Sequence, residues 1–147
     1  MSVTVFDYIK KVERAKALMP YQVDVILREN EAKILDLNRK DQLFNEGINR
    51  FGTIIGRYSQ ATESITNGEK KAGEPFTMYD TGDLYKRFTY LYDAKKQTVE
   101  IFSTDSKVPL LIMKYSENIF GLTPTNKEKL NNQIIKPELL KWLKSLL

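Results

Sequence analysis

The tripeptide Asp80-Thr81-Gly82 is the part of this chain whose residue types most directly suggest chemistry, because it matches the catalytic tripeptide of aspartic proteases. In those enzymes two carboxyl groups share one proton, and the pair divides the acid and base roles between its members. A homodimeric enzyme takes one tripeptide from each of two identical chains, so a chain of 147 residues is long enough. A homodimeric aspartic protease that uses Asp80 is therefore one hypothesis for this sequence.

The residues around the tripeptide favour a structural turn instead. In aspartic proteases the residue after the glycine is small, whereas here it is Asp83, whose carboxylate would add charge beside the catalytic pair. Asp80 and Thr81 can accept hydrogen bonds from the backbone amides that follow them, and Gly82 can adopt a positive φ. Asp83 is then a candidate N-cap for a short helical turn. We predict that Asp80, Thr81, Gly82 and Asp83 form a structural turn, and we predict no catalytic residue.

The composition narrows the chemistry further. The chain has no cysteine and no histidine, which excludes thiolate metal sites, cysteine nucleophiles and Ser–His arrangements. We expect neither a cofactor nor a metal. The net charge is only +4, and the pairs Lys10-Lys11, Lys70-Lys71 and Lys95-Lys96 are separate, so any contact with DNA passing nearby should be weak and non-specific. No apolar run is long enough for a membrane span and the N-terminus does not resemble a signal peptide, so we expect synthesis in a cytoplasm and no membrane partner.

The N-terminal third of the sequence has the pattern of helix. Val5, Ile9 and Val12 have helical spacing, which predicts a helix over residues 4–18 with Thr4 or Ser2 as its N-cap. Met19-Pro20 should end it, because proline disfavours the α conformation in the residue before it. A second helix is predicted over residues 23–39, and Gly47 has the position of a C-cap after a further helical turn.

The middle of the chain changes from loop to strand. Residues 47–73 have little periodicity and are predicted to form a long loop or arm that engages a partner. Residues 76–79 are predicted to be a short strand. Residues 88–93 and 98–103 should pair as a hairpin across a four-residue loop, with Val99, Ile101 and Ser103 on one face. Periodicity allows residues 108–115 to be either a buried helix or a buried strand, and Pro109, which suits the first turn of a helix, favours helix.

The C-terminal section is predicted to end in one long helix. Thr125 and Glu128 have the spacing of a capping box, and Pro137 should kink the helix. We therefore predict a single α+β domain with N-terminal helices, a small antiparallel β-sheet with a hairpin, and a C-terminal helix packed on the sheet. Its sections are residues 1–40 (helices), 47–73 (loop or arm), 76–103 (β-rich) and 108–147 (helical).

The order of short motifs resembles the virion-morphogenesis or tail-completion proteins of Mu-like phages and related head–tail connector proteins. That family has a Gly, a Tyr/Leu-Ser-x-x-Thr, basic residues, a Leu/Thr-Gly-x-Leu, a hairpin, and then an aromatic-Leu/Gly-Leu before a last helix. The matching segments span roughly residues 40–147. They are Gln42-Leu43-Phe44, residues 52–62 (GTIIGRYSQAT), residues 70–73 (KKAG), residues 79–85 (YDTGDLY) and residues 118–123 (NIFGLT).

The resemblance implies a structural virion protein of a tailed phage or prophage, without catalytic activity, that acts in head–tail joining, neck assembly or tail completion. It would form a ring with copies of itself at the head–tail junction and contact phage connector, portal-side or tail proteins. A small non-enzymatic adaptor domain is a further alternative, beside the protease. The candidate interface residues are Ile54, Ile55, Tyr58, Phe120, Leu122, Trp142, Leu143 and Leu146.

Overall fold

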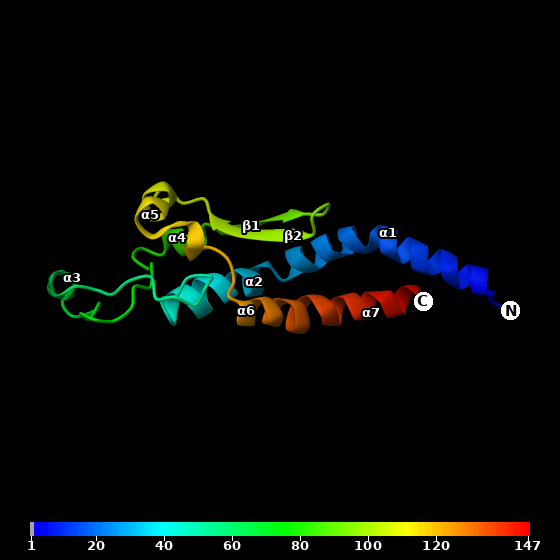
Figure 1. The fold of residues 1–147 in the computed structure, drawn as a ribbon, viewed down its shortest axis with the longest axis horizontal. Helices are drawn as coiled ribbons and strands as arrows, with labels where there is room; N and C mark the ends of the chain where they lie inside the picture. Colours follow the sequence, from blue (N-terminus) through cyan, green and yellow to red (C-terminus); the bar gives the residue numbers. More distant parts are fainter. Residues whose placement is uncertain (1) are drawn as a thin grey trace.

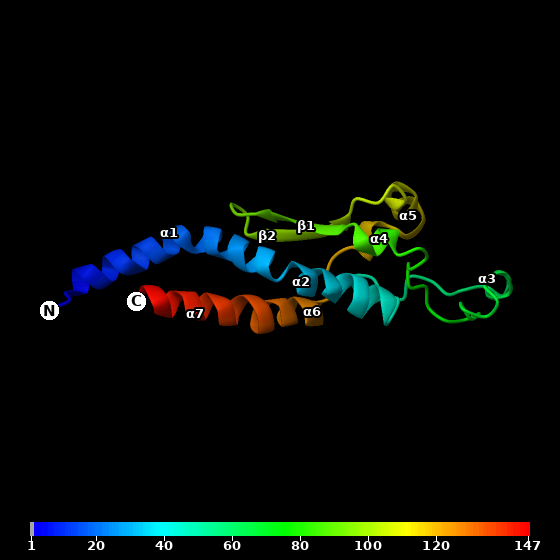
Figure 2. The same ribbon diagram turned by 180° about the vertical axis from the view of Figure 1, so that it is seen from behind.

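Two long helical segments run antiparallel along most of the molecule, and a β-hairpin lies beside them. The computed structural model describes residues 2–147. The first segment is helix α1 (Val5–Glu29), and the second joins α6 (Pro124–Lys129), η3 (Leu130–Ile135) and α7 (Lys136–Leu146). Figures 1 and 2 show an elongated molecule, with the N-terminus at one end and a projecting arm at the other. The α+β class with a hairpin and a C-terminal helix is confirmed.

Helix α1 begins as the sequence predicts but does not end where expected. Thr4 is its N-cap: the Thr4 amide donates to Asp7 Oδ2 (2.9 Å), and the Asp7 amide donates back to Thr4 Oγ1 (3.2 Å). The hydrogen bonds that the Asp7 carboxylate accepts from the Thr4 amide and the Thr4 hydroxyl lower the pKa of the Asp7 carboxyl. The predicted break at Met19-Pro20 is wrong, because α1 continues through Pro20. Met19 and Pro20 are half-buried and line the groove beside the C-terminal helix, with which α1 is in contact.

The helix breaks instead at Asn30, whose side chain donates to the Ile26 carbonyl (2.9 Å). Helix α2 (Glu31–Asn38) follows and passes directly into the wider π turn η1 (Arg39–Phe44), so the helical region extends beyond the predicted end at residue 39. Gly47 closes it with φ of +64° and an amide that donates to the Leu43 carbonyl (3.0 Å). The C-cap of η1 is Asn45, two residues before the predicted Gly47, and Gly47 supplies the left-handed conformation that ends the helical region.

The hairpin is confirmed residue by residue. Strand β1 (Phe88–Asp93) pairs antiparallel with β2 (Thr98–Ser103), and Asp93 Oδ1 accepts hydrogen bonds from two amides of the connecting loop. In β2, Ile101 and Ser103 are buried and Val99 is half-buried, as the alternation predicts. The predicted strand over residues 76–79 is wrong. That segment is extended but lies outside the two-stranded sheet of the described residues, and the positive φ of Met78 interrupts it.

The segments on either side of the hairpin are short. Helix α4 (Asp83–Lys86) precedes β1, and helix α5 (Val108–Tyr115) follows β2 with Pro109 in its first turn, as predicted. The expectation that α5 is buried is wrong: Leu110 is 69% exposed and Met113 is 86% exposed. A single turn, η2 (Glu117–Ile119), then leads towards the C-terminal helix.

The C-terminal helix is capped by a different residue than predicted. Thr123 is the N-cap, and its hydroxyl accepts a hydrogen bond from the Asn126 amide (3.2 Å), so the capping box of Thr125 and Glu128 is not formed. Pro124 then occupies the first turn, where its missing amide costs nothing. Pro137, which has no amide hydrogen to donate, directly follows the π turn η3. The wider turn accommodates the lost hydrogen bond, and the helix continues as α7.

A buried polar cluster joins the N-terminal helices to the segment that enters the C-terminal helix. Gln42 Nε2 donates to the Gly121 carbonyl (2.9 Å), and Gln42 Oε1 accepts from both the Thr123 amide and Asn126 Nδ2 (each 2.9 Å). Asn38 donates to the Ile119 carbonyl (3.1 Å) and accepts from the Gly121 amide (2.8 Å). Gln42 and Asn38 are 1% and 0% exposed, so this cluster fixes the two halves of the core against each other.

The apolar core surrounds this cluster and draws on most elements of the fold other than the arm and α5. Its buried members come from α1, α2, η1, α4, the hairpin, η2 and the C-terminal helix: Leu27, Ile34, Leu35, Leu37, Leu43, Leu84, Phe88, Ile101, Ile119, Phe120, Leu122 and Leu130.

Candidate functional site

The turn at residues 80–83 lies between the base of the arm and α5. Gly82 has φ of +88°, and Thr81 Oγ1 accepts a hydrogen bond from the Asp83 amide (3.3 Å). Asp83 is the first residue of α4, and Gly82 is its N-cap, so Asp83 does not cap the helix. The backbone geometry is that of a tight turn.

Asp80 does not accept the backbone hydrogen bond that the sequence suggested. Among the described residues its carboxylate instead lies near two lysines, with Oδ1 4.0 Å from Lys70 Nζ and Oδ2 3.8 Å from Lys107 Nζ. Lys70 belongs to the arm and Lys107 immediately precedes α5. Asp80 therefore lies between two positive charges from separate segments, and its side chain is 75% exposed.

An aspartic protease needs a second carboxyl close enough to share a proton. Within one copy of the described chain, the Asp80 carboxylate lies within 4.0 Å of two ammonium groups, those of Lys70 and Lys107. This arrangement suits a contact that ties the arm to α5.

Replacing Asp80 by alanine should therefore change the free energy of unfolding by less than about 1 kcal/mol, because exposed ion pairs contribute little. Asp93→Ala is the matched control, since Asp93 accepts two loop amides and its loss should cost more. Urea unfolding of both variants measures the difference. Pepstatin-sensitive peptide cleavage by the parent that Asp80→Ala lacks would show that the interpretation as a turn is wrong.

A small cavity of about 330 Å³ opens beside the turn. Tyr58, Phe76 and Tyr115 contribute aromatic rings to its wall, and their centroids are 5.0 Å (Tyr58–Phe76) and 5.7 Å (Phe76–Tyr115) apart. Nearby, the Tyr85 hydroxyl donates to the Thr77 carbonyl. Burial raises the pKa of Tyr85, so the hydroxyl keeps its proton as a structural donor.

The arm itself is a stem of two extended segments with a short helix near its tip. The Tyr58 amide donates to the Glu74 carbonyl and the Gly73 amide donates to the Tyr58 carbonyl (each 2.9 Å). Helix α3 (Gln60–Ile65) begins at the N-cap Ser59, and Figure 1 shows it at the far end of the molecule. Ile65 on this helix is 81% exposed.

The predicted interface residues fall into two groups. Phe120 and Leu122 are 7% and 6% exposed and belong to the core, which removes them from the candidate interface. The others have accessible surface. Ile54 is exposed at the base of the arm, and the half-buried ones are Ile55 and Tyr58 near the arm and Trp142, Leu143 and Leu146 on α7.

Two apolar surfaces were not predicted from the sequence. One is α5, where Leu110 and Met113 point away from the core. The other is the N-terminal half of α1, whose apolar residues Val5, Tyr8, Ile9 and Val12 are all exposed. Their helical spacing is visible in the sequence, but spacing alone does not show whether another element covers a face.

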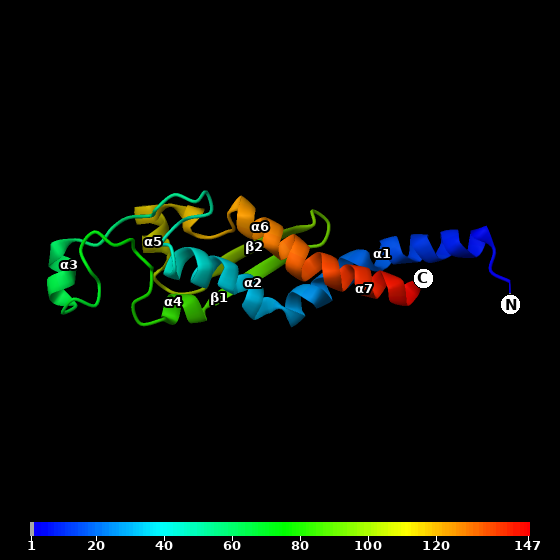
Figure 3. The same ribbon diagram turned by 90° about the horizontal axis from the view of Figure 1, so that it is seen from below.

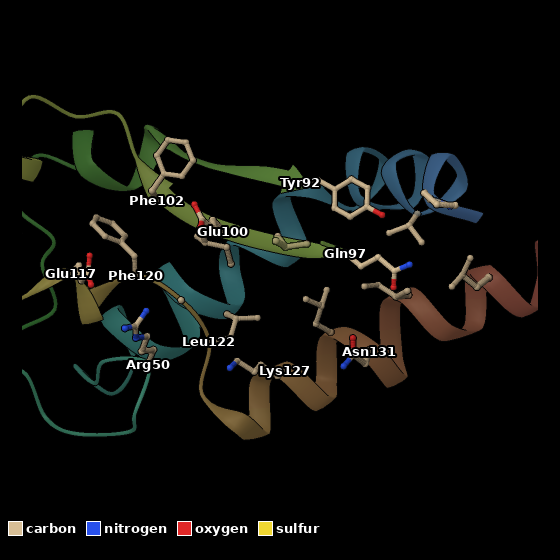
Figure 4. A pocket seen from close by; sticks show the side chains of 18 of the residues that line it. Arg50, Tyr92, Gln97, Glu100, Phe102, Glu117, Phe120, Leu122, Lys127 and Asn131 are labelled. Carbon is tan, nitrogen blue, oxygen red and sulfur yellow. The ribbon is translucent and has the colours of Figure 1, made fainter. Parts of the chain in front are cut away.

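A groove of about 890 Å³ separates the hairpin from the C-terminal helix. Figure 4 shows β2 on one side, with Glu100 and Phe102, and the C-terminal helix on the other, with Lys127 and Asn131. Met19 and Val23 of α1 also line the groove. The groove is lined by both apolar side chains and polar ones.

No helix among residues 2–147 is long and apolar enough to cross a membrane. Comparison with known proteins found no matching family model, no matching curated protein and no matching solved structure.

Proposed function

We propose that this chain is a structural virion protein of a tailed phage or prophage, which acts as a ring subunit in head–tail joining, neck assembly or tail completion. The observation that carries the proposal is the placement of exposed apolar side chains towards both ends of an elongated subunit. Towards the arm end these include Ile65, Leu110 and Met113, and at the opposite end they include Val5 and Ile9. A subunit with apolar surface at two ends can contact a neighbour at each of them.

The motif order supports the same proposal. The segments that resemble phage tail-completion proteins coincide with part of η1, the arm, the turn and the segment that leads into the C-terminal helix. The projecting arm has a shape suited to reaching an adjacent subunit or a connector protein. Phage connector, portal-side and tail proteins are the partners that we propose.

Deletion of the gene from the phage or prophage that carries it should give heads without attached functional tails, and the parent protein supplied in trans should restore the titre. The protein should also be detected by mass spectrometry in purified particles. Full titre after deletion, or absence of the protein from particles, would contradict the proposal.

The variant Leu110→Glu/Met113→Glu should fail to restore the titre, because two carboxylates on α5 would have to be desolvated at a contact. Both side chains are exposed, so the fold should survive, as circular dichroism can check. The control Asn132→Glu/Gln133→Glu adds the same charge at exposed polar positions of the C-terminal helix and should restore the titre. Equal complementation by both variants would exclude α5 as a contact surface.

A further inference from the structure

The N-terminal half of α1 carries an apolar stripe that no residue within 2–147 covers. The stripe consists of Val5, Tyr8, Ile9 and Val12, which are 73%, 52%, 46% and 43% exposed. Residues 2–14 are exposed throughout. Figure 3 shows this half of α1 extending beyond the end of α7.

The stripe continues a face that is buried further along the same helix. At 3.6 residues per turn, Val5, Tyr8, Ile9 and Val12 lie on the same side of α1 as Ala15, Val23 and Ile26. Ala15 and Ile26 are buried, and Val23 packs against the core. In the C-terminal half of α1 this face meets the C-terminal helix, with which α1 is in contact. The first turns of α1 therefore present an apolar face of the kind that packs against another helix, but no helix of residues 2–147 covers it.

The order of side chains in the stripe is nearly the same in both directions. Read forwards it is Val, Tyr, Ile, Val at positions 5, 8, 9 and 12, and read backwards it is Val, Ile, Tyr, Val. In an antiparallel pair of identical helices, Val5 would face Val12 of the other copy and Tyr8 would face Ile9. Small side chains then meet small ones and large meet large, which gives even packing along the whole contact.

We infer that α1 pairs with α1 of a second copy of this chain, antiparallel about a two-fold axis between residues 8 and 9. The contact is isologous, so each copy contributes the same stripe. This contact continues the antiparallel packing that α1 already has with the C-terminal helix. It lies on the same face of α1 as Met19 and Val23, which line the groove. The inference depends on α1 alone and holds whether or not the proposed virion role is correct.

The size of the contact sets the expected affinity. Stable interfaces bury about 1,200–2,000 Å² in total, and two helices that touch only over residues 5–12, about two turns of each, bury less than this. The dimer should therefore form at micromolar rather than nanomolar concentration, and sedimentation velocity should be run up to several hundred micromolar. A parent protein that remains monomeric over this range would overturn the inference.

Ile9→Glu should weaken self-association by about 100-fold or more, because a carboxylate would be buried against an apolar helix. Ala17→Glu is the matched control: it adds the same charge to the same helix on the opposite, exposed face and should leave association unchanged. Circular dichroism checks that both variants fold. Association that Ile9→Glu leaves intact would overturn the inference.

Orientation can be tested because the chain has no cysteine, so an introduced cysteine is unique. A mixture of Val5→Cys and Val12→Cys should form disulfide-linked dimers on oxidation. Neither variant alone should do so, because in an antiparallel pair the two copies of either position lie about 10 Å apart along the axis. Efficient oxidation of Val5→Cys alone would indicate a parallel pair and overturn the proposed geometry.

Discussion

Replacing Gln42 by alanine is expected to lower the free energy of unfolding by about 2–4 kcal/mol, since the change removes a buried side chain and leaves its partners unpaired. Gln42 donates to the Gly121 carbonyl and accepts from the Thr123 amide and from Asn126. These three groups lie in or beside the entry to the C-terminal helix. The loss should appear as a lower midpoint in urea unfolding and a lower melting temperature.

Gln133→Ala is the control for this prediction. Gln133 is an exposed glutamine in the C-terminal helix, so its replacement removes the same atoms without disturbing the core. Its effect on stability should be within about 0.5 kcal/mol of zero. Similar losses in both variants would mean that the buried polar cluster contributes no more than an exposed side chain.

Replacing Gly47 by alanine is the second change with a large expected effect. A Cβ at this position would lie 2.5 Å from the Phe76 carbonyl oxygen and 2.6 Å from Pro75 Cβ, and the residue has φ of +64°. Because the nearest atom belongs to the backbone, the base of the arm would have to move. We expect a loss of about 2–4 kcal/mol from backbone strain and overpacking together.

Gly68→Ala separates these two contributions. Gly68 also has a positive φ, of +83°, but a Cβ there would meet no atom within 4 Å. Its replacement should therefore cost only the backbone strain, about 1–2 kcal/mol. The difference between the two variants in urea unfolding measures the clash. Limited proteolysis should also cut the arm of Gly47→Ala faster than that of Gly68→Ala, and equal rates would show that Gly47 does not hold the base of the arm.

The elements that the sequence predicted well depend on neighbours in the chain. The Thr4 cap needs only Asp7, and the hairpin follows from alternating residues on either side of a short loop. The failures depend on residues that are distant in sequence. Pro20 lies within a helix whose partner along the chain, the C-terminal helix, is more than 100 residues away in sequence, and no rule based on adjacent residues contains that information.

The candidate site divides in the same way. The turn at Gly82 could be predicted because a positive φ is a property of one residue. The position of Asp80 between Lys70 and Lys107 could not, since the arm and the start of α5 meet only in the folded chain. The sequence also does not show which apolar residues are buried. Phe120 and Leu110 are both apolar, yet Phe120 lies in the core and Leu110 is exposed.

The π turn η3 has a further consequence for the helix that contains it. At 100° per residue, Leu130 and Ile134 would point about 150° away from the mean direction of Leu139, Trp142, Leu143 and Leu146. The π turn accommodates about one extra residue, which cancels roughly 100° of this offset. Both halves of the helix can then face α1, and both are in contact with it. The apolar residues of this helix therefore form two narrow faces, one before and one within α7, and the π turn rotates them onto the same side of the helix.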